Sequence, residues 1–187
     1  MEQWIKANPP GFGDGWHSYT LSLRCRNWIW LLNFCPSLLN KKICDSLWDQ
    51  LSWLKVHVEF CHGGNHLLEN LISLVMGSLH FKSKDAIKMY NFALKKLKKE
   101  LNEQILSDGG HEERSASYHI QILDRLIELY ILIEIKNISS TEWLIEHISK
   151  MIIWTEKAKT LDNCLPKFND NNYPSKEHIE NILDFGE

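Results

Sequence analysis

Apolar residues recur at every third or fourth position along most of this chain, and that spacing is the strongest constraint on its fold. The clearest stretch lies between residues 37 and 58, where the apolar series is Leu39, Ile43, Leu47, Leu51, Leu54 and Val58. Such spacing places the side chains on one face of an α-helix, whereas a half-buried strand would alternate apolar and polar residues. No stretch of strand alternation occurs in the sequence. The pattern therefore predicts an all-α protein.

Short breaks divide the sequence into successive helices. We predict helices over residues 19–34, 37–58, 65–81, 83–105, 117–135 and 140–159, with a short one over 176–183. The sixth helix begins at Ser139 or Ser140 in this interpretation. Pro36 and the pair Gly63-Gly64 are typical start and stop signals for the second helix. Helices joined by short connections pack antiparallel, as helical hairpins. The Pro- and Gly-rich lead before residue 16 shows no helical period.

The composition excludes some classes of function. The chain of 187 residues has 21 basic and 24 acidic side chains and a net charge of −3, so it lacks the basic excess of a nucleic-acid binder. Its longest apolar stretch, around residues 28–32, is too short to span a membrane. The lead has no apolar segment of the signal-peptide type, so we expect a cytoplasmic protein. The five Cys match no disulfide framework, and we expect reduced, mostly buried thiols.

Two breaks between predicted helices concentrate polar residues. The first, residues 62–70, contains two glycines and brings Asn65 and His66 to the start of a helix. Free N–H groups and the helix dipole make that position favourable for an anion such as a carboxylate. Asn65 could equally be a plain N-cap, with His66 as an ordinary first-turn residue. On these residues alone, the capping interpretation is favoured.

The second break, residues 108–119, places Tyr118 and His119 at the start of the next helix, after Arg114. A tyrosine with its usual pKa of about 10 is a poor base, but a neighbouring cation or histidine makes it serviceable. A polar loop with capping residues explains the same sequence, and alone it is the favoured reading.

The cysteines and histidines raise two further kinds of site. A zinc site from Cys61, His62 and His66 is disfavoured, because Gly63-Gly64 prevents a pair of histidines on one helix face. A Cys-His nucleophile pair stays open, although no local pattern favours any one of the cysteines.

The two breaks together resemble the heparinase II/III family of polysaccharide lyases. The matching motifs are Asn-His-Leu-Leu-Glu-Asn at 65–70 and Asp-Gly-Gly-His-Glu-Glu-Arg-Ser-Ala-Ser-Tyr-His at 108–119. Further matches are Trp16-x-x-Tyr19, Arg26-x-Trp28-Ile29 and Leu165-Pro166-x-Phe168-Asn169-Asp170. The resemblance covers essentially the whole chain in order. The separation from Asn65 to Tyr118, 118 − 65 = 53 positions, also fits the family pattern.

The resemblance implies an incomplete (α/α) toroid of antiparallel helical hairpins, with residues 1–187 as a single, partial domain. It also implies β-elimination at a uronic acid of an acidic polysaccharide. In that reaction the uronate carboxylate is neutralised, a base takes the C5 proton, and an acid protonates the leaving glycosidic oxygen. Heparan-like, alginate-like and bacterial capsular glycans would all meet these requirements. The mechanism requires no metal and no cofactor.

The resemblance also assigns roles to residues. Asn65 and His66 match the groups that neutralise the carboxylate, and Tyr118 matches the acid, which in some relatives is also the base. Four residues are expected to bind substrate, namely Arg114, His119, His111 and Trp16. Among the eight Trp, further stacking on sugar faces is open to Trp28, Trp30 and Trp53.

The chain departs from the family pattern at its C-terminus. Full-length relatives are expected to continue into a β-sandwich domain that supplies another catalytic His, and family members are often exported or periplasmic. We therefore expect a fragment of a larger enzyme, with a separately encoded β-sandwich half as one partner to test. The alternative is a non-catalytic helical module that binds an acidic glycan or a protein.

Overall fold

The computed structural model describes residues 1–138, 140–160, 164–170 and 174–186. Within these ranges the chain contains eight α-helices, two short 3-10 helices and no strand, and Ile105 and His111 form an isolated antiparallel bridge. The all-α prediction is confirmed. No helix in the described part of the chain combines the length and hydropathy that a membrane span needs.

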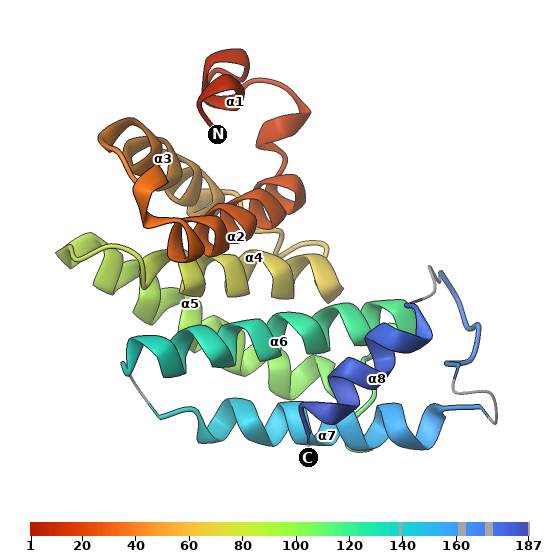
Figure 1. Cartoon of the computed structure of the whole chain (residues 1–187). Helices are drawn as coiled ribbons and strands as arrows, with labels where there is room; N and C mark the ends of the chain where they lie inside the picture. The colour runs from red at the N-terminus through yellow and green to blue at the C-terminus, as the bar shows by residue number, and fades with distance from the viewer. Residues whose placement is uncertain (139, 161–163, 171–173, 187) are drawn as a thin grey trace. The chain divides into compact units, whose positions relative to one another are not determined.

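The chain divides into two compact units, residues 1–97 and 98–187, and each is described by itself. The first unit contains α1 (Glu2–Ala7), α2 (Ser18–Phe34), α3 (Lys41–Val56) and α4 (Gly64–Ser78). Figure 1 shows α2, α3 and α4, which all pack against one another. Their shared interior is aliphatic, and its fully buried members include Leu21, Ile29, Leu47, Leu51, Leu54, Leu68, Leu71 and Ile72. This apolar interior is the main stabilising feature of the unit.

Helix α4 is buried on almost every side. All residues from Leu67 to Ser78 are buried, so the helix has no solvent face over most of its length. Two of its buried polar side chains bond to Ser22 of α2: Asn70 Nδ2 donates to Ser22 Oγ at 3.0 Å, and Ser73 Oγ donates to the Ser22 carbonyl at 2.9 Å. Buried polar groups of this kind specify the contact between α2 and α4.

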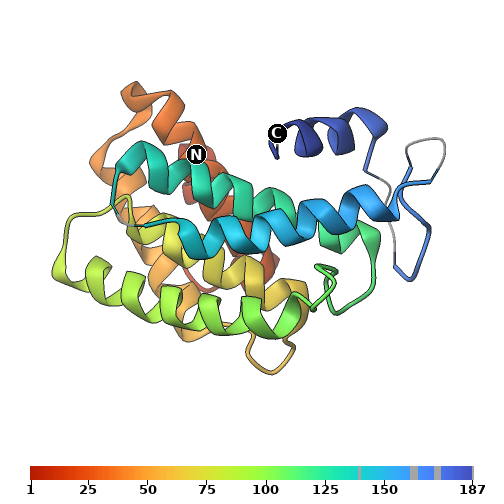
Figure 2. The same ribbon diagram turned by 90° about the horizontal axis from the view of Figure 1, so that it is seen from below.

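The second unit contains α6 (Ala116–Lys136), α7 (Glu142–Ala158) and α8 (Lys176–Asp184), while α5 (Lys84–Gln104) includes the boundary between the units. Helices α6 and α7 pack as an antiparallel hairpin, seen from another side in Figure 2. The buried side chains between them include Leu123, Leu126, Leu129, Leu144 and Met151. Helix α8 joins this pair through His178 Nε2, which lies 2.8 Å from Asp124 Oδ2.

Helix starts differ from the predictions where a capping side chain intervenes. The helix predicted from residue 37 begins at Lys41, because the Asn40 side chain accepts the Ile43 N–H at 3.0 Å and residues 36–38 form a 3-10 turn. The helix predicted from Ser139 or Ser140 begins at Glu142, and Ser139 lies outside the described residues. The lead, predicted without helical order, contains α1 and a 3-10 turn over Asp14–Trp16.

The prediction of mostly buried cysteines is wrong. Only Cys25 is buried, Cys44 and Cys164 are partly exposed, and Cys35 and Cys61 are exposed. The reason is their position: Cys35 follows the end of α2, and Cys61 lies in the turn before α4. Neither is on the apolar face of a helix.

Candidate functional site

The start of α4 holds the first polar motif. Gly63 and Gly64 both have positive φ, 65° and 57°, which glycine adopts without the steric cost of a Cβ. The N-cap position of α4 belongs to Gly63, so the interpretation of Asn65 as an N-cap is wrong. Asn65 is 6% exposed in the first turn, and the side chain of His66 beside it is 41% exposed. The motif thus combines a partly exposed His66 side chain with a buried Asn65.

Glu59 orients His66, and the sequence motifs did not include it. Its Oε1 lies 3.2 Å from His66 Nδ1, and its Oε2 accepts from Asn70 Nδ2 at 3.1 Å. The Glu59 N–H donates to Asn70 Oδ1 at 3.0 Å, so Asn70 holds this residue twice. Because a carboxylate only accepts hydrogen bonds, the network assigns the proton to His66 Nδ1. With the proton on Nδ1, Nε2 is the His66 ring nitrogen that could form a hydrogen bond with a ligand.

Aromatic rings contact both His66 and the predicted substrate-binding residue Trp16. The Tyr19 ring stacks on His66 with centroids 4.1 Å apart and an interplanar angle of 18°. Tyr19 and His66 come from two separately matched motifs, and the structure brings them together. Trp16 is 6% exposed, and its ring packs 6.1 Å from Trp4 and 5.6 Å from Trp53. Its substrate contact stays a prediction, since its neighbours in the structure are other tryptophans.

The start of α6 holds the second motif, and a distant segment closes over it. Ser115 caps the helix by accepting the Tyr118 N–H at 3.3 Å. The Tyr118 hydroxyl donates to Asp170 Oδ2 at 2.5 Å, and Ser115 Oγ donates to the Asp170 carbonyl at 2.5 Å. Asn169 Nδ2 adds a bond to the Arg114 carbonyl at 3.0 Å. Asn169 and Asp170 are thereby bonded to the turn that carries Tyr118.

His119 points into the interior of the second unit. It is 1% exposed, and its Nε2 lies 2.9 Å from Thr155 Oγ1 and 3.2 Å from the Met151 carbonyl. Burial lowers the pKa of His119 to about 4, because the charged ring would be desolvated. The ring is therefore neutral near pH 7.

His111 is also inside, whereas Arg114 is on the surface. His111 is 2% exposed and its Nε2 lies 3.3 Å from Gln104 Oε1; burial lowers the pKa of His111, an effect that Glu113 opposes. Arg114 is exposed with φ at 52°. The substrate contacts predicted for His111, Arg114 and His119 stay predictions, and Arg114 is the one of the three with an exposed side chain.

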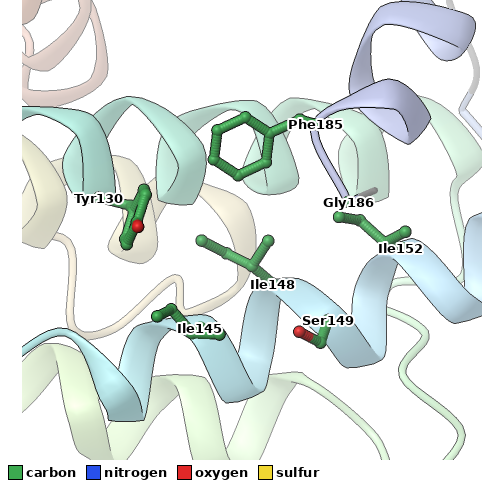
Figure 3. Close-up of a pocket in the computed structure, with 7 residues that line it drawn as sticks. All are labelled: Tyr130, Ile145, Ile148, Ser149, Ile152, Phe185 and Gly186. Carbon is green, nitrogen blue, oxygen red and sulfur yellow. The ribbon is translucent and has the colours of Figure 1, made fainter.

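A pocket lined mainly by Ile and aromatic side chains lies elsewhere in the second unit. Its volume is about 320 Å³, and it is lined by Tyr130, Ile145, Ile148, Ser149, Ile152, Phe185 and Gly186 (Figure 3). This lining has no cation for a carboxylate, so the pocket does not suit a uronic acid. Among the residues that the structure describes, no group of three or more His, Cys, Asp or Glu side chains could hold a metal ion.

Comparisons with known proteins agree in pointing to one family. Residues 2–185 match the profile described as Heparinase II/III N-terminus. A heparin-sulfate lyase of Bacteroides thetaiotaomicron is 31% identical over 190 residues, a match that covers 90% of this chain and 27% of the relative. The chain therefore spans about a quarter of the length of that curated relative.

Solved structures give the same result for the fold. The crystal structure of heparinase III matches with a TM-score of 0.76 and 27% identity, over 96% of this chain and 30% of the other. The crystal structure of a heparan sulfate lyase from Pedobacter heparinus matches with a TM-score of 0.67 and 19% identity, over 99% of this chain and 34% of the other. The fold class is that of the N-terminal (α/α) toroid of heparinase III, which confirms the prediction.

Proposed function

The chain belongs to the heparinase II/III family and corresponds to the N-terminal domain of that family. On that basis we propose that it is the helical catalytic domain of a polysaccharide lyase. The substrate is an acidic polysaccharide, cleaved by β-elimination at a uronic acid. The observation that carries the proposal is the family match over residues 2–185, which includes both polar motifs at the starts of α4 and α6.

The first motif supplies the groups that neutralise the uronate carboxylate. Loss of the C5 proton leaves negative charge on the carboxylate oxygens of an enolate-like state. Donors placed where this charge develops are commonly worth about 3 kcal/mol each. We assign this task to the Asn65 amide and to His66, whose ring is oriented by the Glu59 carboxylate at 3.2 Å from Nδ1.

The second motif supplies the acid. When a base takes the C5 proton, the electron pair of the C5–H bond forms the C4–C5 double bond and the C4–O bond breaks. The departing glycosidic oxygen then takes a proton, which we assign to the Tyr118 hydroxyl. In the structure that hydroxyl donates its proton to Asp170 at 2.5 Å, so the proposed acid role requires the O–H group to turn from Asp170 to the glycosidic oxygen when substrate binds. A separately encoded β-sandwich half, as a further partner, is part of the same proposal.

A lysis assay with paired variants tests the proposal. The purified chain is incubated with a panel of uronate polysaccharides, and the unsaturated product is followed by ultraviolet absorbance. We expect lysis of at least one polysaccharide, with a loss of about 100-fold or more in His66→Ala and Tyr118→Phe. Tyr130→Phe, on the same helix as Tyr118, is the matched control and is expected to stay within twofold of the wild type.

Two results would contradict the proposal. One is unchanged lysis in both His66→Ala and Tyr118→Phe, which would reject the assigned roles. The other is a wild-type chain that binds uronate polysaccharide but lyses none of the panel, which would favour the non-catalytic glycan-binding module.

A further inference from the structure

A second concave site lies on one face of α7, and neither polar motif accounts for it. It has a volume of about 690 Å³, within the usual size of ligand pockets, and we call it the α7 pocket. Its lining comprises Ser107, Asp108, Lys150, Ile153, Trp154, Lys157, Ala158, Pro166 and Phe168. All of these residues belong to the second unit.

Helical spacing explains why cations and an aromatic ring share this face. Lys150, Trp154 and Lys157 stand at positions i, i+4 and i+7 of α7, so they project from the same side. The two lysines are separated by about 10 Å of helix rise, a length on the scale of a disaccharide. A single ligand could therefore contact the Trp154 indole and both lysine ammonium groups.

Trp154 is held in place from two sides. Its ring lies 4.3 Å from the ring of buried His119. The chain at Gly109 and Gly110 lies flat against α7, since a Cβ at Gly109 would collide with the Lys150 carbonyl and one at Gly110 would meet Trp154 Nε1. The Gly-Gly pair of the second motif thus allows this close approach. The remaining, partly exposed edge of Trp154 lines the pocket.

The other wall is the segment that also holds Tyr118. Phe168 is 61% exposed, and with Pro166 it contributes an apolar surface opposite α7. Because Phe168 lines the pocket and is exposed, its ring is accessible to a ligand there. The C–H faces of a pyranose ring are apolar and pack on aromatic rings, while its carboxylate or sulfate groups need cations.

Two carboxylates limit the charge of the pocket. Lys150 Nζ already pairs with Glu146 at 2.7 Å, but this pair is exposed and such pairs contribute little in water. Asp108 Oδ1 accepts the Gly110 N–H at 2.9 Å, which keeps that oxygen occupied within its own turn. The lining itself holds two cations and one anion, and therefore favours an anionic ligand.

We propose that the α7 pocket is a subsite for an anionic sugar residue, with Trp154 and Phe168 contacting the ring and Lys150 and Lys157 binding its carboxylate or sulfate groups. The inference rests on the proposed function, because that function provides the acidic polysaccharide. It adds a binding site on α7 that is separate from the residues assigned to neutralisation and proton transfer.

Binding of a heparin-derived hexasaccharide, measured by titration calorimetry, tests this subsite. The measurements use the His66→Ala chain, so that the sugar stays intact and the contact between Tyr118 and Asp170 beside the pocket is kept. We expect Kd to rise about tenfold or more in a Lys150→Gln, Lys157→Gln double variant, and about threefold in Phe168→Ala. All three side chains are exposed, so the melting temperature should not change. The matched control is Lys95→Gln, Lys99→Gln on α5, which removes the same charge elsewhere and should stay within twofold.

Three results would overturn the proposal. Equal weakening in both lysine double variants would indicate general charge attraction, and complete displacement by a large excess of inorganic sulfate would indicate a site for free anions. Absence of hexasaccharide binding would also reject the subsite. Maltohexaose, a neutral sugar of the same length, is expected not to bind. Because the readout is binding and not lysis, failure of the catalytic proposal leaves this test interpretable.

Discussion

The two polar motifs are held in different ways. In the first unit, His66 is oriented by Glu59, whose side chain is 9% exposed and whose other partner, Asn70, is fully buried in α4. In the second unit, Tyr118 is held by Asp170, an exposed residue on a connecting segment. One orienting contact is part of a buried core network, and the other is a surface contact.

Because of this difference, substitutions at the two motifs should affect the free energy of unfolding and the proposed activity to different extents. A change at the first motif should alter both the free energy of unfolding and the proposed activity, because an unpaired buried polar group destabilises the fold. A change at Asp170 should alter activity with little effect on unfolding. The two histidines differ in the reverse sense: the side chain of His66 is 41% exposed beside a carboxylate, whereas His119 is 1% exposed.

The largest expected effect is the acid sensitivity of the second unit. Since the pKa of His119 is about 4 in the fold and near 6.5 when unfolded, its contribution is complete above pH 6.5 and is lost as the pH falls towards 4. The difference corresponds to about 3 kcal/mol at pH 4. Hydrogen exchange of amides in α6 and α7, compared with α2 and α4, measures it between pH 7 and pH 4.5.

His119→Gln is the control for this prediction. The variant should be less stable at pH 7 but should lose less stability on acidification than the wild type. Equal pH dependence in the two proteins would show that His119 is not the group responsible.

The next effect is expected at the first motif. Glu59→Ala leaves Asn70 Nδ2 and His66 Nδ1 without their carboxylate, so we expect about 2 kcal/mol lower unfolding free energy. The proposed lysis should fall about 30-fold, because we expect the loss of the contact that orients His66 to raise the activation barrier by about 2 kcal/mol. Urea unfolding and the lysis assay measure the two. Glu177→Ala, an exposed glutamate on α8, is expected to change neither.

A smaller effect is expected at the second motif. Asp170→Ala removes the acceptor of the Tyr118 hydroxyl and should lower lysis about tenfold, or about 1.4 kcal/mol. Asp170→Asn keeps an oxygen acceptor and should lose less. Urea unfolding should show a change below about 0.5 kcal/mol in both, as for most surface substitutions. If Asp170→Ala lost as much unfolding free energy as Glu59→Ala, the two motifs would not differ in how their orienting contacts support the fold.

The smallest effect concerns the cysteines. Their positions are expected to affect the rate at which each thiol is modified, and not the stability of the fold. Burial raises the pKa of Cys25 to about 12, so its thiol is both inaccessible and protonated at pH 8. A thiol reagent should label the exposed Cys35 and Cys61 in the native protein and Cys25 only after unfolding. Mass spectrometry of peptides identifies the labelled sites, and early labelling of Cys25 would contradict the buried position.

Several features could be predicted because their cause is local. The sequence predicted the six long helices α2 to α7 and the short α8, and the residues around Asn65 and Tyr118 carried the family resemblance that the comparisons confirmed. The start of α3 at Lys41 was missed because the Asn40 cap lies outside the apolar repeat. The roles of the site residues remain proposals, but their helix-start positions follow from the Gly-Gly turn before α4 and the Ser115 cap of α6.

The sequence by itself determined the helical fold and the family, because apolar spacing and short motifs act over a few residues. The tertiary structure alone decided the partners of those motifs: Glu59 for Asn70, eleven positions away, and Asp170 for Tyr118, fifty-two positions away. It also decided that His111 and His119 are buried while Arg114 is exposed. Such contacts depend on how whole helices pack, and burial in that packing sets which groups stay neutral and which meet solvent.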